Sequence, residues 1–194
     1  MNEKIGVIAI LFTLLSVSSS QYPLILILCY AIHEGGHLFF AKACGVKMRK
    51  FQMKLFRLRI SYDFEGVSYK KELVVSLGGI VFNLVFLALP LIFRLKMAEI
   101  TVFYILCNAS LALMNIYPVS SLDGGRVLRC LLLLIFQEER AIKIYNFISA
   151  FAVGVLWIFA VYLQLVFNSN VSLFFISVFL LVQICFSSEK LYKK

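Results

Sequence analysis

The stretch from Pro23 to Ala43 decides how the rest of the sequence is interpreted, and it reads PLILILCYAIHEGGHLFFAKA. It is about as long as the roughly 20 apolar residues that a helix needs to cross a bilayer. Glu34 and Lys42 interrupt its apolar character, together with the histidines of the HEGGH motif. The sequence therefore predicts a transmembrane helix that carries ionisable groups inside the membrane.

The two histidines of the chain, His33 and His37, both belong to this motif. Positions i and i+4 lie on one helix face, about 40° apart, so both rings converge on one ion. Glu34 lies beside them, where it can take a proton from a water molecule at a metal. Charged groups inside a span cost about 2.5–3.5 kcal/mol or more each, which favours a functional role. The alternative is that the histidines form hydrogen bonds between helices.

A catalytic zinc takes three protein ligands and keeps one position open for water. With no further histidine, the third ligand must be Asp, Glu or Cys. Asp123 is the acidic residue inside an apolar region, whereas the others are terminal, interfacial or in a basic segment: Glu3, Asp63, Glu65, Glu72, Glu99, Glu138, Glu139 and Glu189. The alternative is that Asp123 only caps the helix that follows it.

Helix lengths place Asp123 roughly 20 Å and His37 about 10 Å from the inner membrane surface. Helix tilt and a chain break after Pro118 would reduce this difference.

Composition supports a polytopic membrane protein. The chain has 194 residues, of which 62% are hydrophobic and 15% charged, against roughly half and a quarter in soluble domains. The apolar residues form blocks at 5–20, 23–43, 73–93, 100–118, 122–136, 147–167 and 171–186. The block at 122–136 is too short to cross alone, so we join it to the preceding block as one span broken at Pro118. The expected fold is all-α with about six transmembrane helices.

Charge predicts the orientation. The net charge is +9, and nine of the 19 Lys and Arg residues lie between Lys42 and Lys71. Basic residues mark the cytoplasmic side, so both termini are predicted to be cytoplasmic.

The basic residues do not form an aromatic-interleaved stripe, which argues against nucleic-acid binding. The first apolar block also resembles a signal peptide, with Lys4 before it and Ser18-x-Ser20 after it.

The segment from Val46 to Lys70 differs from its surroundings. Apolar and polar residues alternate from Phe56 to Phe64, which predicts a half-buried strand. Gly66 would turn the chain into a second strand at Val67–Lys70. We therefore expect a small β-hairpin or sheet at the cytoplasmic membrane surface, and an irregular basic loop is the alternative.

The five cysteines are scattered and are interpreted as unpaired hydrophobic residues.

Three stretches resemble the signatures of the site-2 protease family of intramembrane zinc metalloproteases. They are HEGGH at 33–37, GGIVFN at 78–83 and NIYPVSSLDGGR at 115–126. The smaller, sporulation-type bacterial members are the most similar in outline. The resemblance covers residues 23–130 and implies one zinc ion per chain, bound by His33, His37 and Asp123. It also implies that Glu34 is the general base.

The same resemblance implies that Asn83 and Asn115 lie near the substrate, where they would donate to a developing oxyanion. Hydrogen bonding between helices is the alternative for both. The chain departs from the family pattern at Ile80, Ser120 and Ser121, where prolines are common. We expect no PDZ module and no regulatory nucleotide-binding domain.

The expected organisation is one membrane domain over residues 1–194. It comprises a catalytic core at about 22–136, the β segment at 46–70 and C-terminal helices at 144–187. The expected function is hydrolysis of a membrane-embedded or membrane-tethered protein near the cytoplasmic face, for example a transcription factor or its inhibitor, in a bacterial cell membrane. The alternatives are a metal or ion transporter and a catalytically silent scaffold. The sequence does not indicate which oligomeric state the protein adopts.

Overall fold

A computed structural model describes residues 21–54, 57–62, 66–119 and 122–167 of the chain. Internal contacts divide the chain into two compact units, Met1–Met114 and Asn115–Lys194. The boundary falls within the last turn of one helix, α4. Each unit is described separately below, and the prediction of a single domain stays a prediction.

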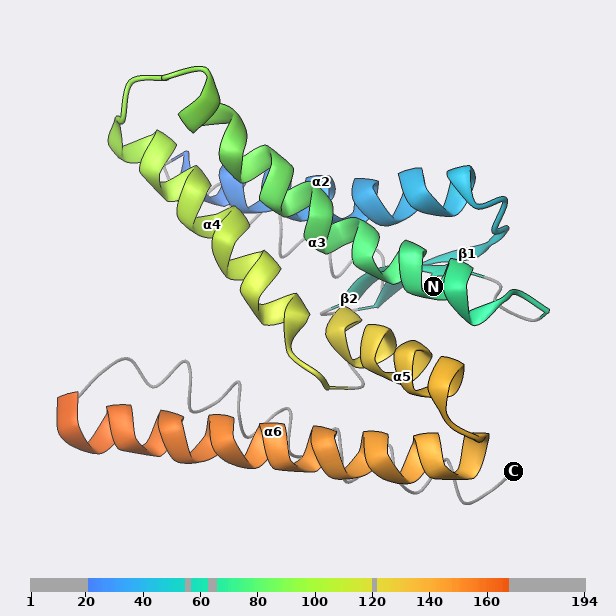
Figure 1. Cartoon of the computed structure of the whole chain (residues 1–194). Helices are drawn as coiled ribbons and strands as arrows, with labels where there is room; N and C mark the ends of the chain where they lie inside the picture. Colours follow the sequence, from blue (N-terminus) through green and yellow to red (C-terminus); the bar gives the residue numbers. More distant parts are fainter. Residues whose placement is uncertain (1–20, 55–56, 63–65, 120–121, 168–194) are drawn as a thin grey trace. The chain divides into compact units, whose positions relative to one another are not determined.

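The first unit is built on two long apolar helices, α2 (Tyr22–Ala43) and α3 (Tyr69–Ile92), which cross closely (Figure 1). Ser68 caps α3, where its side chain accepts a hydrogen bond from the backbone N–H of Lys70. The helices approach through glycines: a Cβ at Gly36 would strike the backbone carbonyl of Gly78. Small residues allow this backbone-to-backbone contact, as in other membrane helix pairs.

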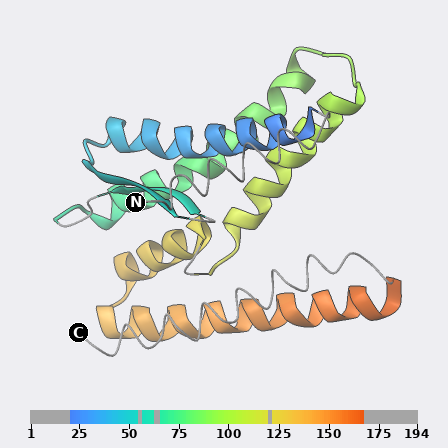
Figure 2. The same cartoon turned by 180° about the vertical axis from the view of Figure 1, so that it is seen from behind.

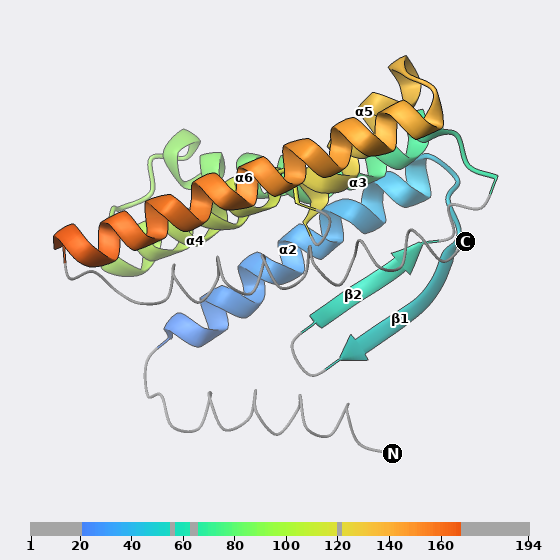
Figure 3. The same cartoon turned by 90° about the horizontal axis from the view of Figure 1, so that it is seen from below.

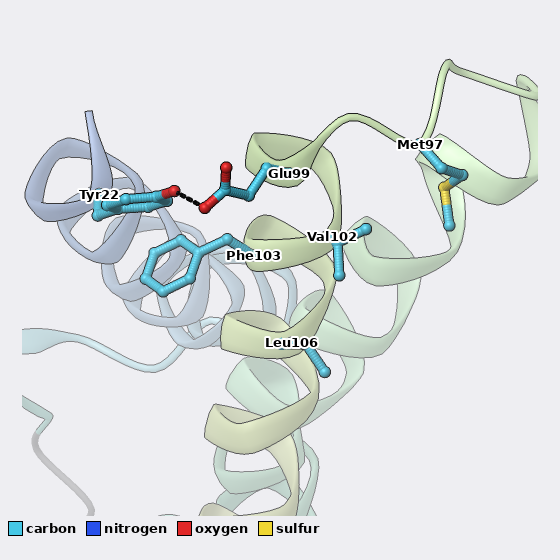
Figure 4. Close-up of a pocket in the computed structure, with 6 residues that line it drawn as sticks. All are labelled: Tyr22, Met97, Glu99, Val102, Phe103 and Leu106. Atoms are coloured by element: carbon cyan, nitrogen blue, oxygen red, sulfur yellow. Dashed lines mark hydrogen bonds between the residues drawn. The ribbon is translucent and has the colours of Figure 1, made fainter. Parts of the chain in front are cut away.

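Helix α4 (Glu99–Ile116) belongs to the same unit and packs against α2. At the start of both helices the Tyr22 hydroxyl donates to the Glu99 carboxylate, and Phe103 meets the Tyr22 ring edge-on (Figure 4). These side chains line a pocket of about 440 Å³. Deeper in the helix pair, the Asn108 amide donates to the Cys29 sulfur over 3.1 Å. The Cys29 thiol in turn donates to the backbone oxygen of Tyr104, so apolar packing and three polar contacts hold the pair.

Two strands follow α2, namely β1 (Met48–Lys54) and β2 (Arg57–Tyr62). They pair antiparallel with Phe51 opposite Ile60 (Figure 3). The predicted strand at 56–64 overlaps β2, but its partner precedes it in the chain. The predicted second strand at Val67–Lys70 is wrong, because the Ser68 cap starts α3 there.

The second unit contains α5 (Asp123–Ile135) and α6 (Glu138–Phe167). A two-residue connection lets the two helices pack side by side, which can be followed from both sides in Figures 1 and 2. Leu132 of α5 packs with Ala141 and Tyr145 of α6 in one apolar cluster. A second cluster joins Val119 of the preceding loop to Val153 of α6.

Within the described residues, four helices are long and apolar enough to span a membrane: α2, α3, α4 and α6. Together with the family match reported below, they indicate an integral membrane protein. Six spans are not supported by the described part, and the expected first and last spans lie outside it. The joined span at 100–136 is wrong, since α4 reaches spanning length alone and α5 is a separate helix.

The interpretation of the cysteines can be assessed at four positions. Cys29, Cys44, Cys107 and Cys130 are not in disulfides, and all except the half-buried Cys44 are buried. Cys185 lies outside the described residues.

Candidate metal centre

Two buried histidines on α2 form the centre of the first unit. His33 and His37 are only 4% and 5% exposed. Their Nε2 atoms are 3.2 Å apart, and their rings meet edge-to-face with centroids 4.8 Å apart. One turn of helix separates the two residues, so the convergence expected from the i, i+4 spacing is confirmed.

Helix α3 determines how the two imidazoles are oriented. Nδ1 of His37 lies 2.8 Å from the backbone oxygen of Val75, and Nδ1 of His33 lies 3.2 Å from Oδ1 of Asn83. A carbonyl or amide oxygen can only accept, so each Nδ1 carries the proton and donates it. Each neutral ring then keeps its Nε2 lone pair, the one that faces the other histidine.

A glycine on α3 makes room for both rings. A Cβ at Gly79 would lie 2.5 Å from Nε2 of His37 and 2.6 Å from Cε1 of His33. Such distances are far below van der Waals contact, so any larger residue would displace the imidazoles. Val75, Gly79 and Asn83 follow each other at intervals of four and therefore form one stripe of α3.

Glu34 is held by its own helix. The Tyr30 hydroxyl, one turn earlier on α2, donates to Oε1 of Glu34 over 3.0 Å. Glu34 is half-buried, in contrast to the buried histidines beside it. The contact limits the rotation of the carboxylate and leaves its second oxygen unoccupied by Tyr30.

In the second unit, Asp123 is the first residue of α5 and is 5% exposed. Leu122 occupies the N-cap position with an extended backbone, so Asp123 is not the N-cap residue of the helix. A carboxylate in the first turn is stabilised by the helix dipole. Arg126 Nη2 lies 3.4 Å from the Asp123 carboxylate, which partly balances its buried charge.

The loop before α5 is fixed to α6. The Tyr117 hydroxyl donates to the backbone oxygen of Ala152 over 2.6 Å, and burial raises the pKa of this phenol, which keeps it a donor. Val119 is fully buried against Val153. A Cβ at Gly124 would strike the backbone oxygen of Ile116, so glycine is needed for α5 to begin this close to the end of α4.

The histidine pair fits a zinc ion. Two nitrogens that bind tetrahedral zinc at about 2.0–2.1 Å are about 3.3 Å apart, by the geometry of a tetrahedron. The observed Nε2–Nε2 distance of 3.2 Å matches this value. Hydrogen bonding of the opposite ring nitrogens to oxygen acceptors is the usual support of metal-binding histidines.

These features define a helical membrane protein with a buried pair of histidines that could hold a metal ion. Peptidase family M50, the site-2 protease family, matches the chain over residues 91–159. This match supports the membership that the motifs predicted, and it includes Asn115 and Asp123 but not the HEGGH motif. No curated protein matches the chain closely in sequence.

The structure brings His33, His37 and Asn83 together: Oδ1 of Asn83 contacts His33, and its Nδ2 has no hydrogen-bond partner. Asn115 lies in the last turn of α4. The roles assigned to Glu34, Asp123, Asn83 and Asn115 stay predictions.

Sequence reasoning missed Tyr30, Val75 and Gly79. Tyr30 was detectable, since it precedes Glu34 by one helical turn. Val75 acts through its backbone oxygen, which leaves no signal in the side chain. Gly79 was noted only as part of a motif, and its packing role depends on the helix crossing.

Proposed function

We propose that this chain is a zinc-dependent intramembrane peptidase in which His33, His37 and Asp123 hold one zinc ion. All three side chains are buried, and they offer the ring nitrogens and carboxylate oxygen that zinc prefers. The observation that carries the proposal is the orientation of both histidines by α3, which presents two Nε2 lone pairs at zinc-ligand spacing. The M50 match supports peptidase activity over ion transport.

Zinc in such a site supplies a Lewis acid that polarises a carbonyl and makes water nucleophilic near neutral pH. Glu34 then acts as the general base, accepting the proton of the attacking water at its carboxylate. The same residue passes that proton to the leaving amine when the peptide bond breaks. The hydrogen bond from Tyr30 keeps the carboxylate in one position during both transfers.

Asn83 and Asn115 are proposed to serve the substrate. The Nδ2 atom of Asn83 is buried and has no hydrogen-bond partner, so it is available as a donor to a developing oxyanion. Asn115 is half-buried at the end of α4.

The proposed substrate is a membrane-embedded or membrane-tethered protein, for example a transcription factor or its inhibitor. Because a membrane helix already satisfies its backbone hydrogen bonds, it must unwind before cleavage. We propose a bacterial cell membrane with both termini of the peptidase in the cytoplasm, where water can reach the site. Side-specific labelling of single cysteines at positions 50 and 96 tests this orientation, and label at both from one side would contradict it.

Strand β2 is proposed to receive the unwound segment by strand addition. Only one edge of β2 pairs with β1 in the described two-stranded sheet. Neighbouring backbone donors point to opposite edges of a strand. Leu58→Pro and Arg59→Pro therefore remove donors from different edges, and one should reduce cleavage more than the other. Equal rates in both variants, with zinc retained, would contradict strand addition.

Glu34→Gln provides the test of the proposed function. This change removes the base and keeps both histidines, so zinc content should stay near one per chain while cleavage stops. Single-span membrane helices reconstituted with the protein in liposomes serve as the substrate pool, and mass spectrometry detects their fragments. Glu99→Gln is the matched control, since Glu99 lies at the start of α4 and contacts Tyr22. Cleavage at the wild-type rate by the Glu34→Gln protein would overturn the proposal.

A further inference from the structure

The stripe of α3 that faces the histidines contains one side chain with a polar head, Asn83. It is fully buried, and its Oδ1 lies 3.2 Å from Nδ1 of His33. A buried amide oxygen without a hydrogen-bond partner carries a desolvation penalty, so this contact stabilises the folded protein. The other histidine needs no such side chain, because the Val75 carbonyl accepts its proton.

The two supports differ in how easily they can be lost. A backbone carbonyl is present whatever residue occupies position 75. The Asn83 oxygen that lies 3.2 Å from Nδ1 of His33, by contrast, depends on the side chain at position 83. Without it, the His33 proton is free to reside on Nε2, and that tautomer cannot offer its Nε2 lone pair to a metal.

We infer that Asn83 is a positioning residue of the metal centre: its Oδ1 holds His33 as the Nδ1–H tautomer. This inference rests on the proposed metal site but does not depend on peptidase activity. The amide has a second consequence. Since Oδ1 is occupied by His33, the amide orientation is fixed and Nδ2 points elsewhere, where it lacks a partner. Asn83 thus combines orientation of a ligand with a spare donor.

Two substitutions at this position separate the acceptor from the donor. Asn83→Asp keeps an oxygen acceptor for His33 and removes the N–H donor. Asn83→Leu introduces a side chain of similar size and removes both the acceptor and the donor. Asn108→Leu is the matched control, because Asn108 is also fully buried, lies on α4 and contacts Cys29 instead of a histidine.

The first measurement reads the tautomer directly. The chain has only two histidines, so protein labelled with ¹⁵N-histidine gives four ring-nitrogen signals. His37→Gln protein assigns them. In metal-free protein in bicelles, at a pH where both rings are neutral, His33 should be the Nδ1–H tautomer in wild type, Asn83→Asp and Asn108→Leu. Asn83→Leu should shift His33 toward the Nε2–H form while the His37 signals stay in place.

The second measurement is zinc affinity, by competition with a chelator. Loss of a supporting hydrogen bond to a metal ligand weakens binding by about 10–100-fold, which is the loss expected for Asn83→Leu. Asn83→Asp and Asn108→Leu should keep a zinc affinity within about tenfold of the wild-type value.

Three results would overturn the inference. One is an unchanged His33 tautomer and zinc affinity in Asn83→Leu. Another is a loss of zinc affinity of about tenfold or more in Asn83→Asp relative to wild type, a result that does not require Asn83→Leu to fold. The third is an equal loss in Asn108→Leu, because that would indicate general destabilisation. A wild-type protein that binds zinc without cleaving any peptide would refute the proposed function and leave this inference intact.

Discussion

The HEGGH segment of α2 and the segment around Asp123 support their buried polar groups in different ways. On α2, one helix supplies both histidines, and one neighbouring helix supplies both of their hydrogen-bond acceptors. Asp123 instead begins a short helix after a loop that is anchored to α6 by the Tyr117 hydroxyl and by Val119. A regular helix crossing fixes the first site, whereas a loop conformation fixes the second. The difference predicts which substitutions disturb each segment.

The largest effect is expected from removal of a proposed ligand. His37→Ala should lower zinc affinity by more than the roughly 100-fold that a lost supporting hydrogen bond costs. Asp123→Ala should lower the zinc affinity to a similar extent, because Asp123 is the third proposed ligand. Elemental analysis of purified protein measures the zinc content. A full complement of zinc in Asp123→Ala would remove Asp123 from the ligand set and leave the histidine pair unaffected.

An intermediate effect is expected at the helix crossing. Gly36→Ala places a methyl group against the Gly78 carbonyl, and overpacking of this kind costs about 1–3 kcal/mol. The free energy of unfolding in bicelles and the zinc affinity should both decline.

Gly35 is the matched control within the same motif, because nothing lies within 4 Å of a Cβ built there. Gly35→Ala should be neutral or stabilising by about 0.4–1 kcal/mol, since it reduces the freedom of the unfolded chain. Equal destabilisation by both changes would contradict the close crossing of α2 and α3.

A smaller effect is expected in the second segment. Gly124→Ala pushes the first turn of α5 away from the Ile116 and Tyr117 carbonyls, and a loop can yield more easily than a helix crossing. We expect a stability loss near the lower end of about 1–3 kcal/mol, and a decrease in zinc affinity through Asp123 alone.

Gly154→Ala in α6 serves as its control, since a Cβ there meets no atom within 4 Å. The histidine tautomers should stay unchanged in both variants. Altered histidine signals in Gly124→Ala would contradict the expectation that the HEGGH segment and the segment around Asp123 are stabilised independently.

The sequence alone predicted the membrane class, the helices α2 and α3, the part of α6 from Phe147 onward and the convergence of His33 and His37. Each follows from local rules, namely the length of an apolar run and the 3.6-residue period. The sequence misjudged the region after α4, because an apolar run does not reveal whether its helix continues through a proline-containing loop. It also misplaced the partner of β2, since alternation identifies a strand but not the strand that pairs with it.

Only the tertiary structure decided how the histidines are held. The Val75 carbonyl, the space above Gly79 and the Asn83 oxygen reach His33 and His37 because two helices cross at Gly36 and Gly78. These contacts join residues 38 to 50 positions apart on different helices. The sequence therefore predicted which groups carry the chemistry, and the helix crossing decided which hydrogen-bond partners the two histidines meet, because such partners depend on distance in space.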